Sequence, residues 1–536
     1  MTAERTPRVA FVGGQVWTDG FSSSRALDVL IGGGQILDVA RRGELDTGGA
    51  EVHDISGKLL TPGFQDAHIH PATGGLDLLS CDLSGLQTPD EVYAAIRDYA
   101  ASHPDQPAIT GGGWNRDVFG VAGPSRFTLD TLVGDRPAFL SPADRHGAWV
   151  NSAAMAAAGV SDSTPDPDAG SFTRDGRGVL TGMIEEGALS VVKAAIPRRS
   201  DAELVAAALA AQDHLLGFGV TSVQDAIVGT GLGMDDMLPA YRKLLVDDDF
   251  RLRLTAALWW DPGRGVEQIA DLVERRRVLE SVAGPERVIA DMVKIMVDAT
   301  GVVFLGEDEL RDATVALDAA GFNVHYHSYG DATTHRVLNA VETAIAGNPP
   351  RKRRHQIAHL MVIAEDDFAR FARLGVTANV QVFWGDIPVH PVMIAHATMT
   401  EDPHRREYAF ARLQAAGARL AAGSDWPVTT ADPLAAARSS VRRPSRGESK
   451  SVDELDRLDL QAVFGAYTVG SAFVNGRADT TGRIARGFVA DVAVFDRDVF
   501  QGDEALNNAV VDEVWIGGLR VTHPPTAGAE QGLAGG

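Results

Sequence analysis

The sequence contains a single cysteine, Cys81, which excludes an internal disulfide and a metal cluster held by several thiolates. Because Cys81 lies in no recognisable motif, we expect a small buried residue rather than a nucleophile. The sequence also lacks any apolar run of about 18 residues and any basic segment followed by an apolar stretch. We therefore expect neither a membrane span nor a secretory signal, and we expect a cytoplasmic protein.

Acidic residues outnumber basic ones, and the formal net charge is −23 at pH 7. A charge of this sign repels nucleic acid and anionic membranes, and it favours solubility. We expect a small molecule as the partner instead. The chain of 536 residues is longer than one ordinary domain, but a barrel with an appended module would accommodate it.

Residues 61–70 read T-P-G-F-Q-D-A-H-I-H and contain two histidines two positions apart. Side chains at i and i+2 of a strand point to the same face, so His68 and His70 can bind one metal ion together. Pro62 and Gly63 mark the start of this strand. Surface alternation can also produce such a pair by chance, so the motif needs support from the rest of the chain.

Seven further apolar runs are typical of buried parallel strands, and helical stretches that end in glycine lie between most of them. The runs are 219–225, 251–260, 287–298, 321–327, 355–360, 376–382 and 418–425. Eight alternating units predict an α/β fold, a (β/α)8 barrel whose active site lies at the carboxyl ends of the strands. The residues at those ends, on strands four, five, six and eight, are Lys294, His327, His359 and Asp425.

This order of ligands resembles the amidohydrolase superfamily of metal-dependent hydrolases. Within it, the chain resembles the branch of N-substituted formamide deformylase and YtcJ-like proteins, amidohydrolase family 3. The matching segments are P-G-F-Q-D-A-H-I-H at 62–70, D-R-H-G-A-W-V-N-S at 144–152, G-M-I-E-E-G-A at 182–188, H-S-Y-G-D-A at 327–332 and G-S-D-W-P-V at 423–428. Two segments depart from the pattern: Gln356-Ile357-Ala358-His359 replaces R-I-E-H, and Asp298-Ala299-Thr300 replaces D-G-S.

The resemblance implies a site with one or two divalent ions, zinc first among them. A hydrolytic site needs neutral imidazoles, anionic oxygen ligands and an open position for water. The expected ligands are His68, His70, Lys294, His327, His359 and Asp425. In this superfamily the lysine is often carboxylated to a bridging carbamate, and the apolar neighbours of Lys294 would depress its pKa and permit that reaction. If Lys294 instead extends from a strand end to solvent, we expect one metal rather than two.

Asp425 is the residue that we expect to transfer protons. A metal lowers the pKa of bound water to roughly 7, so a carboxylate beside it can take the proton and pass it to a leaving amine. Asp425 could also cap a helix that begins near Pro427, and the two roles are compatible. The resemblance places His146 over the active site as a contact to substrate oxygen. His325 shares a face with His327 and remains open as a ligand or an indirect donor.

Evidence on the substrate comes mainly from tryptophans, which favour an apolar or aromatic molecule over a sugar. The expected substrate contacts are Trp114, Arg116, Glu186 and Trp426. Arg116 could meet a carboxylate, but a salt bridge near Asp117 is an equal alternative. Glu186 matches the family motif, although an exposed helical glutamate explains it nearly as well.

Both ends of the chain contain short strands with glycine turns, too few at either end to bury a core alone. We therefore expect one β-sandwich from residues 1–60 and 476–525, a barrel over 61–475, an inserted small α/β subdomain over 71–218 and a disordered tail over 526–536. The resemblance also implies a homodimer. The expected reaction is hydrolysis of an amide or related C–N bond. Alternatives are hydrolysis of an ester, lactone or carbamate on the same site and, more remotely, a non-catalytic scaffold protein similar to dihydropyrimidinase.

Overall fold

The computed structural model describes residues 8–143, 147–167, 170–231, 234–299, 302–386, 406–441 and 456–521. The chain divides into two compact units. Among the described residues, the first contains the chain up to His70, Gln212–Gly231 and the chain from Tyr241 to Val521; the second contains the described parts of Pro71–Ala211 and Leu232–Ala240. None of the helices in the described ranges combines the length and the apolar character that a membrane crossing requires.

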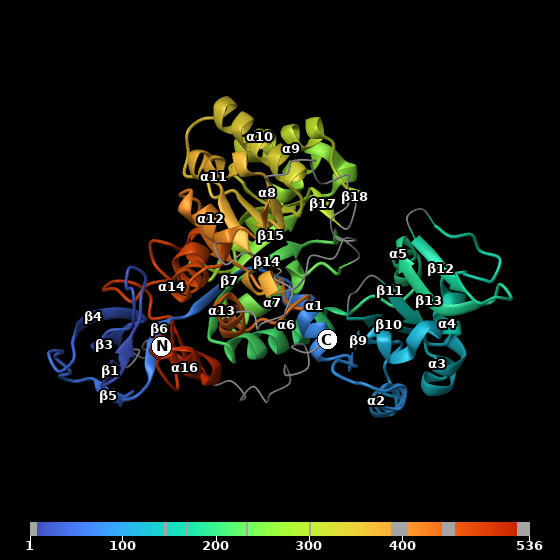
Figure 1. Cartoon of the computed structure of the whole chain (residues 1–536), viewed down its shortest axis with the longest axis horizontal. Helices are drawn as coiled ribbons and strands as arrows, with labels where there is room; N and C mark the ends of the chain where they lie inside the picture. The colour runs from blue at the N-terminus through green and yellow to red at the C-terminus, as the bar shows by residue number, and fades with distance from the viewer. Residues whose placement is uncertain are drawn as a thin grey trace. The chain divides into compact units, whose positions relative to one another are not determined.

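The first unit is built on an eight-stranded, nearly closed parallel barrel (Figure 1). Its strands in chain order are β7 (Phe64–Ile69), β14 (Val220–Val228), β15 (Arg253–Trp259), β16 (Val288–Met296), β19 (Asn323–Ser328), β20 (Gln356–His359), β22 (Thr377–Val380) and β24 (Arg419–Ala422). The backbone N–H of Asp425 donates to the carbonyl of His68 at 2.8 Å, which joins the last strand to the first. The predicted barrel and the order of its strands are confirmed.

Helices follow the barrel strands, as the glycine-terminated stretches predicted (Figure 1). They are α7 (Leu238–Val246), α8 (Ile269–Glu280), α9 (Glu307–Ala319), α10 (Asp331–Gly347), α11 (Phe368–Leu374), α12 (Phe410–Ala415) and α13 (Pro433–Val441). Helix α6 (Asp201–Leu216) instead precedes β14, and only its residues from Gln212 onward belong to the first unit. Helix α11 ends at Gly375, whose φ of 68° lies in the left-handed region that glycine adopts without steric cost. The short helices α14 (Leu460–Gly465), α15 (Ser471–Val474) and α16 (Asp503–Asn508) complete the first unit.

Two terminal sheets pack around a shared core, as expected from the sequence. The first contains β4 (Gln35–Arg41), β3 (Leu27–Gly32), β1 (Val9–Val12) and β5 (Glu51–Asp54), in that order. The second contains β2 (Gln15–Val16), β6 (Leu59–Pro62), β25 (Val492–Phe495), β26 (Val511–Ile516) and β27 (Leu519–Val521). Strand β6 pairs antiparallel with β25, so both ends of the chain contribute to one sheet. Phe11, Val494 and Trp515 are buried together between the sheets.

The second unit is a small α/β structure with its own core. Its six-stranded sheet contains β12 (Gly170–Arg174), β13 (Leu180–Glu186), β11 (Gly147–Val150), β10 (Ala138–Pro142), β9 (Ile109–Trp114) and β8 (Cys81–Asp82), in that order. The accompanying helices are α1 (Pro71–Leu78), α2 (Pro89–Ser102), α3 (Arg126–Val133), α4 (Ser152–Ala157) and α5 (Gly187–Lys193). Cys81 is buried in this core, which confirms its expected place as a small apolar residue.

Candidate metal centre

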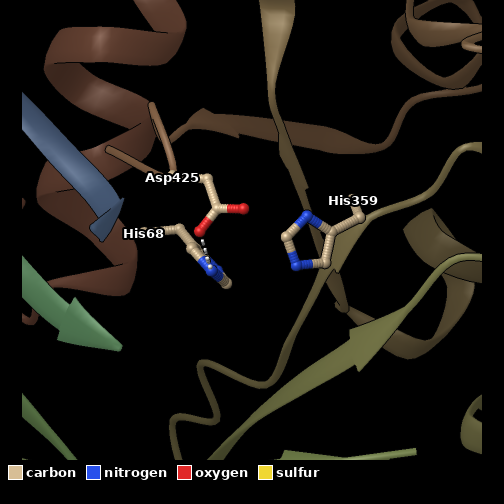
Figure 2. Close-up of side chains that lie close together, drawn as sticks. All are labelled: His68, His359 and Asp425. Atoms are coloured by element: carbon tan, nitrogen blue, oxygen red, sulfur yellow. Dashed lines mark ion pairs between the residues drawn. The ribbon is translucent and has the colours of Figure 1, made fainter. Parts of the chain in front are cut away.

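Three buried side chains at the carboxyl ends of barrel strands point toward one another: His68, His359 and Asp425 (Figure 2). Their nearest ligand atoms all lie within 4.8 Å of one another. Nε2 of His68 is 3.2 Å from Oδ1 of Asp425, and Nε2 of His70 is 3.0 Å from the same oxygen. The fold therefore brings together residues that are far apart in the sequence, two imidazoles and a carboxylate from strands one, six and eight.

The donor atoms of this cluster fit a metal ion. Both ring nitrogens of His359 are buried without a hydrogen-bond partner in the described part of the chain, and so is Nδ1 of His70. An unpaired buried polar group costs about 1–3 kcal/mol, so native proteins rarely leave one without compensation. Two or three imidazoles with one carboxylate form a typical ligand set for a catalytic zinc ion. A divalent ion held here would compensate one of the two unpaired nitrogens of His359.

The charge states of these groups also suit a cation. Burial, reinforced by the neighbouring His327 and His68, holds the pKa of His359 well below its usual range, so this imidazole is neutral. Burial alone would raise the pKa of Asp425, but the hydrogen bond from His70 outweighs burial and lowers it. The site therefore presents neutral nitrogens and an ionised oxygen, the protonation states in which these groups bind metals.

The backbone is strained at two of these three residues. His359 has a φ of 80° and Asp425 a φ of 57°, in the left-handed region that residues other than glycine rarely adopt. Such conformations cost about 1–3 kcal/mol and occur mostly at functional sites. The segment after Asp425 forms a turn closed by Val428 N–H on the Asp425 carbonyl at 2.8 Å. Helix α13 begins only at Pro433, so Asp425 does not cap a helix, contrary to the alternative drawn from the sequence.

Gly423 and Asp66 bring the first and last strands close enough for the site to form. A Cβ atom on Gly423 would lie 2.5 Å from the Cβ of His68, so this position in the G-S-D motif requires glycine. The carboxylate of Asp66 accepts the backbone N–H of His68 at 3.0 Å and that of Ser424 at 3.1 Å. Burial raises the pKa of Asp66 to about 7, although these donors oppose the rise. Asp66 lies in the H-x-H segment, but its role was missed from the sequence.

His327 is oriented by Asp298. Its Nδ1 is 3.2 Å from Oδ1 of Asp298, and the same carboxylate accepts the backbone N–H groups of Tyr329 at 2.9 Å and Gly330 at 3.2 Å. Because the carboxylate can only accept, Nδ1 of His327 carries the proton and Nε2 keeps its lone pair. The ring of His327 lies 4.3 Å from that of His359. In the sequence, Asp298 stands out only as part of a departure from the family pattern.

Lys294 is buried within β16, with 1% of its surface exposed. Burial lowers the pKa of its amine to about 7, and the charge of Asp425 opposes this shift. The side chain does not extend to solvent, which removes the alternative of an exposed lysine at a strand end. A substantial share of the amine is therefore neutral at neutral pH.

Aromatic rings surround the histidines of the centre. Trp384 stacks on His359 with 5.0 Å between ring centroids and 18° between planes, and Tyr329 lies 4.3 Å from His327. Trp426, an expected substrate contact, follows Asp425 and stacks on His214 of α6 at 4.8 Å. Trp384 follows the predicted strand 376–382, so a position at a strand end was expected from the sequence, but the contact with His359 was not.

The expected substrate contacts in the second unit have different surroundings. Trp114 is 1% exposed in the core of that unit, and its indole N–H donates to the carbonyl of Leu140 at 3.2 Å. Trp114 therefore stabilises the unit, a correction to the substrate contact expected from the sequence. Arg116 forms a bidentate pair with Glu185, at 2.7 and 2.9 Å. His146 and the side chain of Glu186 lie outside the described residues.

A parallel (β/α)8 barrel with histidines and an aspartate at the carboxyl ends of its strands is the fold of metal-dependent hydrolases. The family model for the amidohydrolase family, type 3, matches residues 51–522, and the chain belongs to this family. A solved structure, an uncharacterized metal-dependent hydrolase from Pyrococcus furiosus, shares the fold with a TM-score of 0.71 and 24% identity, covering 92% of this chain and 100% of that one.

Two curated relatives are similar over most of their length. Putative amidohydrolase YtcJ of Bacillus subtilis (strain 168) is 29% identical over 487 residues, 85% of this chain and 88% of that protein. N-substituted formamide deformylase of Arthrobacter pascens is 26% identical over 508 residues, 89% of this chain and 91% of that protein. The resemblance inferred from the sequence motifs is thus confirmed.

Proposed function

We propose that the protein is a metal-dependent amidohydrolase that cleaves an amide or related C–N bond in a small molecule, of the N-acyl, N-formyl or carbamate type. The observation that carries this proposal is the buried cluster of His68, His359 and Asp425, in which His359 has ring nitrogens without a hydrogen-bond partner among the described residues. The similarity to a protein named N-substituted formamide deformylase supports the choice of a C–N bond. The Tyr329 and Trp384 rings beside the ligands support an apolar or aromatic substrate.

Each residue of the cluster has a proposed role in binding the metal or in transferring a proton. His68, His70, His327, His359 and Asp425 would hold the metal, with zinc proposed first. When bound, a divalent ion supplies Lewis acidity that polarises a carbonyl group and activates water at neutral pH. Asp425 would accept the proton of the attacking water and deliver it to the leaving nitrogen. The position of its Oδ1 atom in the cluster, 3.0 Å from Nε2 of His70, supports this role.

Lys294 is proposed as a further ligand after carboxylation. Its neutral Nζ would attack carbon dioxide, forming a C–N bond and releasing one proton to solvent, and the resulting carbamate offers two anionic oxygens. The burial of Lys294 between Val293 and Ile295 supports this proposal, because a buried amine is readily neutral. With the carbamate, the site would have enough ligands for two ions; without it, one ion is expected.

Removal of the metal tests the proposed function. We expect the protein as purified to contain zinc or another divalent ion, and complete chelation to reduce hydrolysis of N-acyl and N-formyl substrates to the uncatalysed level. Re-addition of zinc should restore the rate. Activity that persists in demonstrably metal-free protein would refute the proposal. Comparison of an amide with its isosteric ester would show whether the C–N bond is preferred.

Substitution of Lys294 by alanine should weaken metal binding by at least about 10–100-fold, since even the loss of an indirect metal partner has that effect. The rate should fall with metal occupancy, and added acetate or propionate should restore part of both by replacing the carbamate oxygens. Metal content and turnover can be measured on the same sample. Lys243→Ala, which removes an exposed lysine paired with Asp247, is the control and should change neither. A Lys294→Ala protein with full metal content would exclude a ligand role.

A further inference from the structure

Four polar side chains and one metal-site histidine form a continuous hydrogen-bonded ring inside the barrel. All five are at most 1% exposed, and they come from strands one, two, five, six and seven: His68, Gln224, His325, Gln356 and Asn379. The ring starts at the backbone carbonyl of Ala67 and ends at the imidazole of the next residue, His68. Buried amides so far from any surface are costly unless each donor and acceptor is matched.

The carbonyl of Ala67 fixes the direction of every amide in the ring. A carbonyl can only accept, so Nδ2 of Asn379 must face it, at 2.9 Å. The same Nδ2 donates its second hydrogen to Oε1 of Gln356, also at 2.9 Å. Nε2 of Gln356 then faces Gln224 and donates to its Oε1 at 2.5 Å. The oxygen of Gln224, rather than its nitrogen, is therefore turned toward His325.

The oxygen of Gln224 in turn fixes the protons on two histidines. It lies 2.5 Å from Nδ1 of His325, which must carry a hydrogen to donate to it. No carboxylate contacts His325 in the described residues, and a buried imidazolium without one would be costly, so its Nε2 has a lone pair. That Nε2 is 2.7 Å from Nδ1 of His68, which therefore donates. His68 is left with its lone pair on Nε2, the atom that lies 3.2 Å from Asp425.

We propose that His325 is a positioning residue that holds His68 in the tautomer and ring orientation required to bind the metal, with Gln224 fixing the proton on His325. The inference rests on the proposed metal site. It adds to that site a relay of uncharged hydrogen bonds from Gln224 through His325 to His68, by which residues that do not contact the metal set the tautomer of a ligand. Partners of this kind orient metal-binding histidines and make them more basic. Here an amide and a second histidine take the place of the usual carboxylate.

The test measures cobalt(II) and zinc(II) affinity of metal-stripped protein by competition with a chelator, together with the visible spectrum of the cobalt(II) form. His325→Phe and Gln224→Met keep the approximate side-chain volume and remove the relay. We expect each to bind both ions about 10–100-fold more weakly than the wild type. The cobalt spectrum should shift as well, because the Nε2 ligand from His68 is no longer held in place.

Tyr326→Phe is the matched control, one position along the same strand from His325. Tyr326 is fully buried, and its hydroxyl is 2.9 Å from Oγ1 of Thr314 on α9, on the other face of β19. Its loss should lower thermal stability and leave metal affinity and the cobalt spectrum unchanged. Gln224→Glu retains an acceptor toward His325, so this variant should bind metal at least as tightly as the wild type.

The outcomes separate the relay from the site itself. Wild-type affinity and spectrum in His325→Phe would overturn the relay, and so would an equal loss of affinity in Tyr326→Phe. Failure of Gln224→Glu to bind better than Gln224→Met would also contradict it, because the effect would then come from packing. If Gln224→Glu does not fold, the comparison of His325→Phe with Tyr326→Phe still decides. A wild-type protein that binds neither ion would refute the proposed function instead.

Discussion

Replacement of Asp425 by asparagine should lower kcat/KM for the best amide substrate by about 10²–10⁴-fold, the usual contribution of a general acid–base group. Asparagine keeps an oxygen at the position that now lies 3.0 Å from Nε2 of His70, so most of the bound metal should remain. The amide oxygen cannot hold the transferred proton at neutral pH, so the chemical step should be the one affected. Steady-state kinetics with metal analysis of the same preparation measures both quantities.

Asp367→Asn is a suitable control for Asp425→Asn. Asp367 is also a buried carboxylate, but it pairs with Arg370 at 2.9 Å on the outer helices and takes no part in the metal centre. This control should lose stability and keep its rate per folded molecule. Near-normal turnover of metal-replete Asp425→Asn would contradict the proton-transfer role. His146 and Glu186 would then be the first candidates for the base.

The barrel could be predicted from the sequence because its strands lie in short apolar runs, and because helical stretches that end in glycine separate most of these runs. All eight predicted runs became strands, with bounds that differ from the prediction by only a few residues, for example 219–225 against Val220–Val228. Parallel strands in a barrel all end on one side, so a polar residue at each strand end predicts a shared site. His68, His359 and Asp425 meet for this reason, and the H-x-H motif and the resemblance to the family singled them out among the polar residues at strand ends.

The partners of these residues could not be predicted, because polar side chains within strands give no sign of what they will contact. Gln224 bonds to His325, 101 residues away, and Asn379 bonds to the carbonyl of Ala67, 312 residues away. In the sequence, Gln356 stands out only because it replaces an arginine of the family pattern. In the structure it accepts a hydrogen bond from Asn379 and donates one to Gln224, so it links the two other amides. Such contacts depend on the register of neighbouring strands, which a sequence does not display.

Trp114 shows where the strand-end argument fails. It does lie at the end of a strand, β9, but this strand belongs to the sheet of the second unit and not to the barrel. In that sheet, the rings of Phe119 and Trp149 pack against it, with centroids 5.4 and 6.4 Å away. A residue at a strand end is evidence for a site only when the sheet to which it belongs is known.

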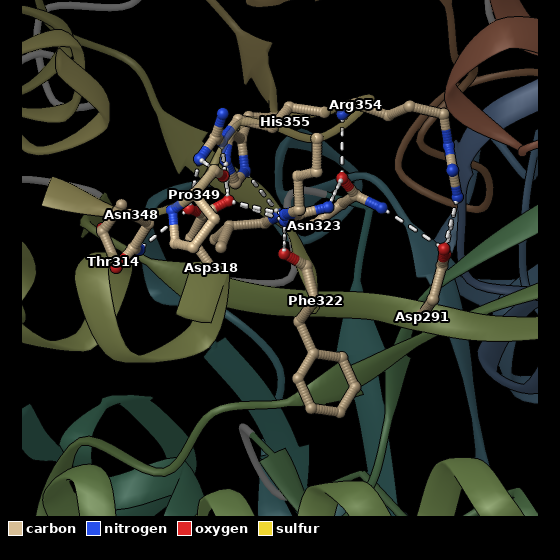
Figure 3. A network of polar contacts seen from close by, with 12 residues as sticks. Asp291, Thr314, Asp318, Phe322, Asn323, Asn348, Pro349, Arg354 and His355 are labelled. Carbon is tan, nitrogen blue, oxygen red and sulfur yellow. Dashed lines mark hydrogen bonds and ion pairs between the residues drawn. The ribbon is translucent and has the colours of Figure 1, made fainter. Parts of the chain in front are cut away.

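Asp318 is the centre of a buried charged network that supports the strand carrying His359 (Figure 3). It lies on α9 with no exposed side-chain surface, and its carboxylate accepts from Arg351 at 2.7 Å and from Arg353 at 2.8 Å. Both arginines precede β20, and Nε2 of His355 adds a third contact at 3.3 Å. Burial alone would raise the pKa of Asp318, but hydrogen bonds from His355, Arg353 and Asn348 hold it far below its usual range. One carboxylate thus balances two arginines.

Asp318→Asn should therefore lower the free energy of unfolding at pH 7 by about 3–5 kcal/mol, since removal of one partner leaves buried charges uncompensated. Chemical denaturation measures the change. Asp479→Asn is the control, because Asp479 pairs with Lys352 on the exposed surface, and this substitution should lower the free energy of unfolding by about 0.5 kcal/mol or less.

The depressed pKa of Asp318 also gives the sign of the pH dependence. Stability from Asp318 is present above its unfolded pKa of about 4 and is lost as pH falls toward its folded pKa, so the difference between wild type and variant should shrink below about pH 4. A difference that is small at pH 7, or that grows on acidification, would show that the network does not stabilise the fold through this charge.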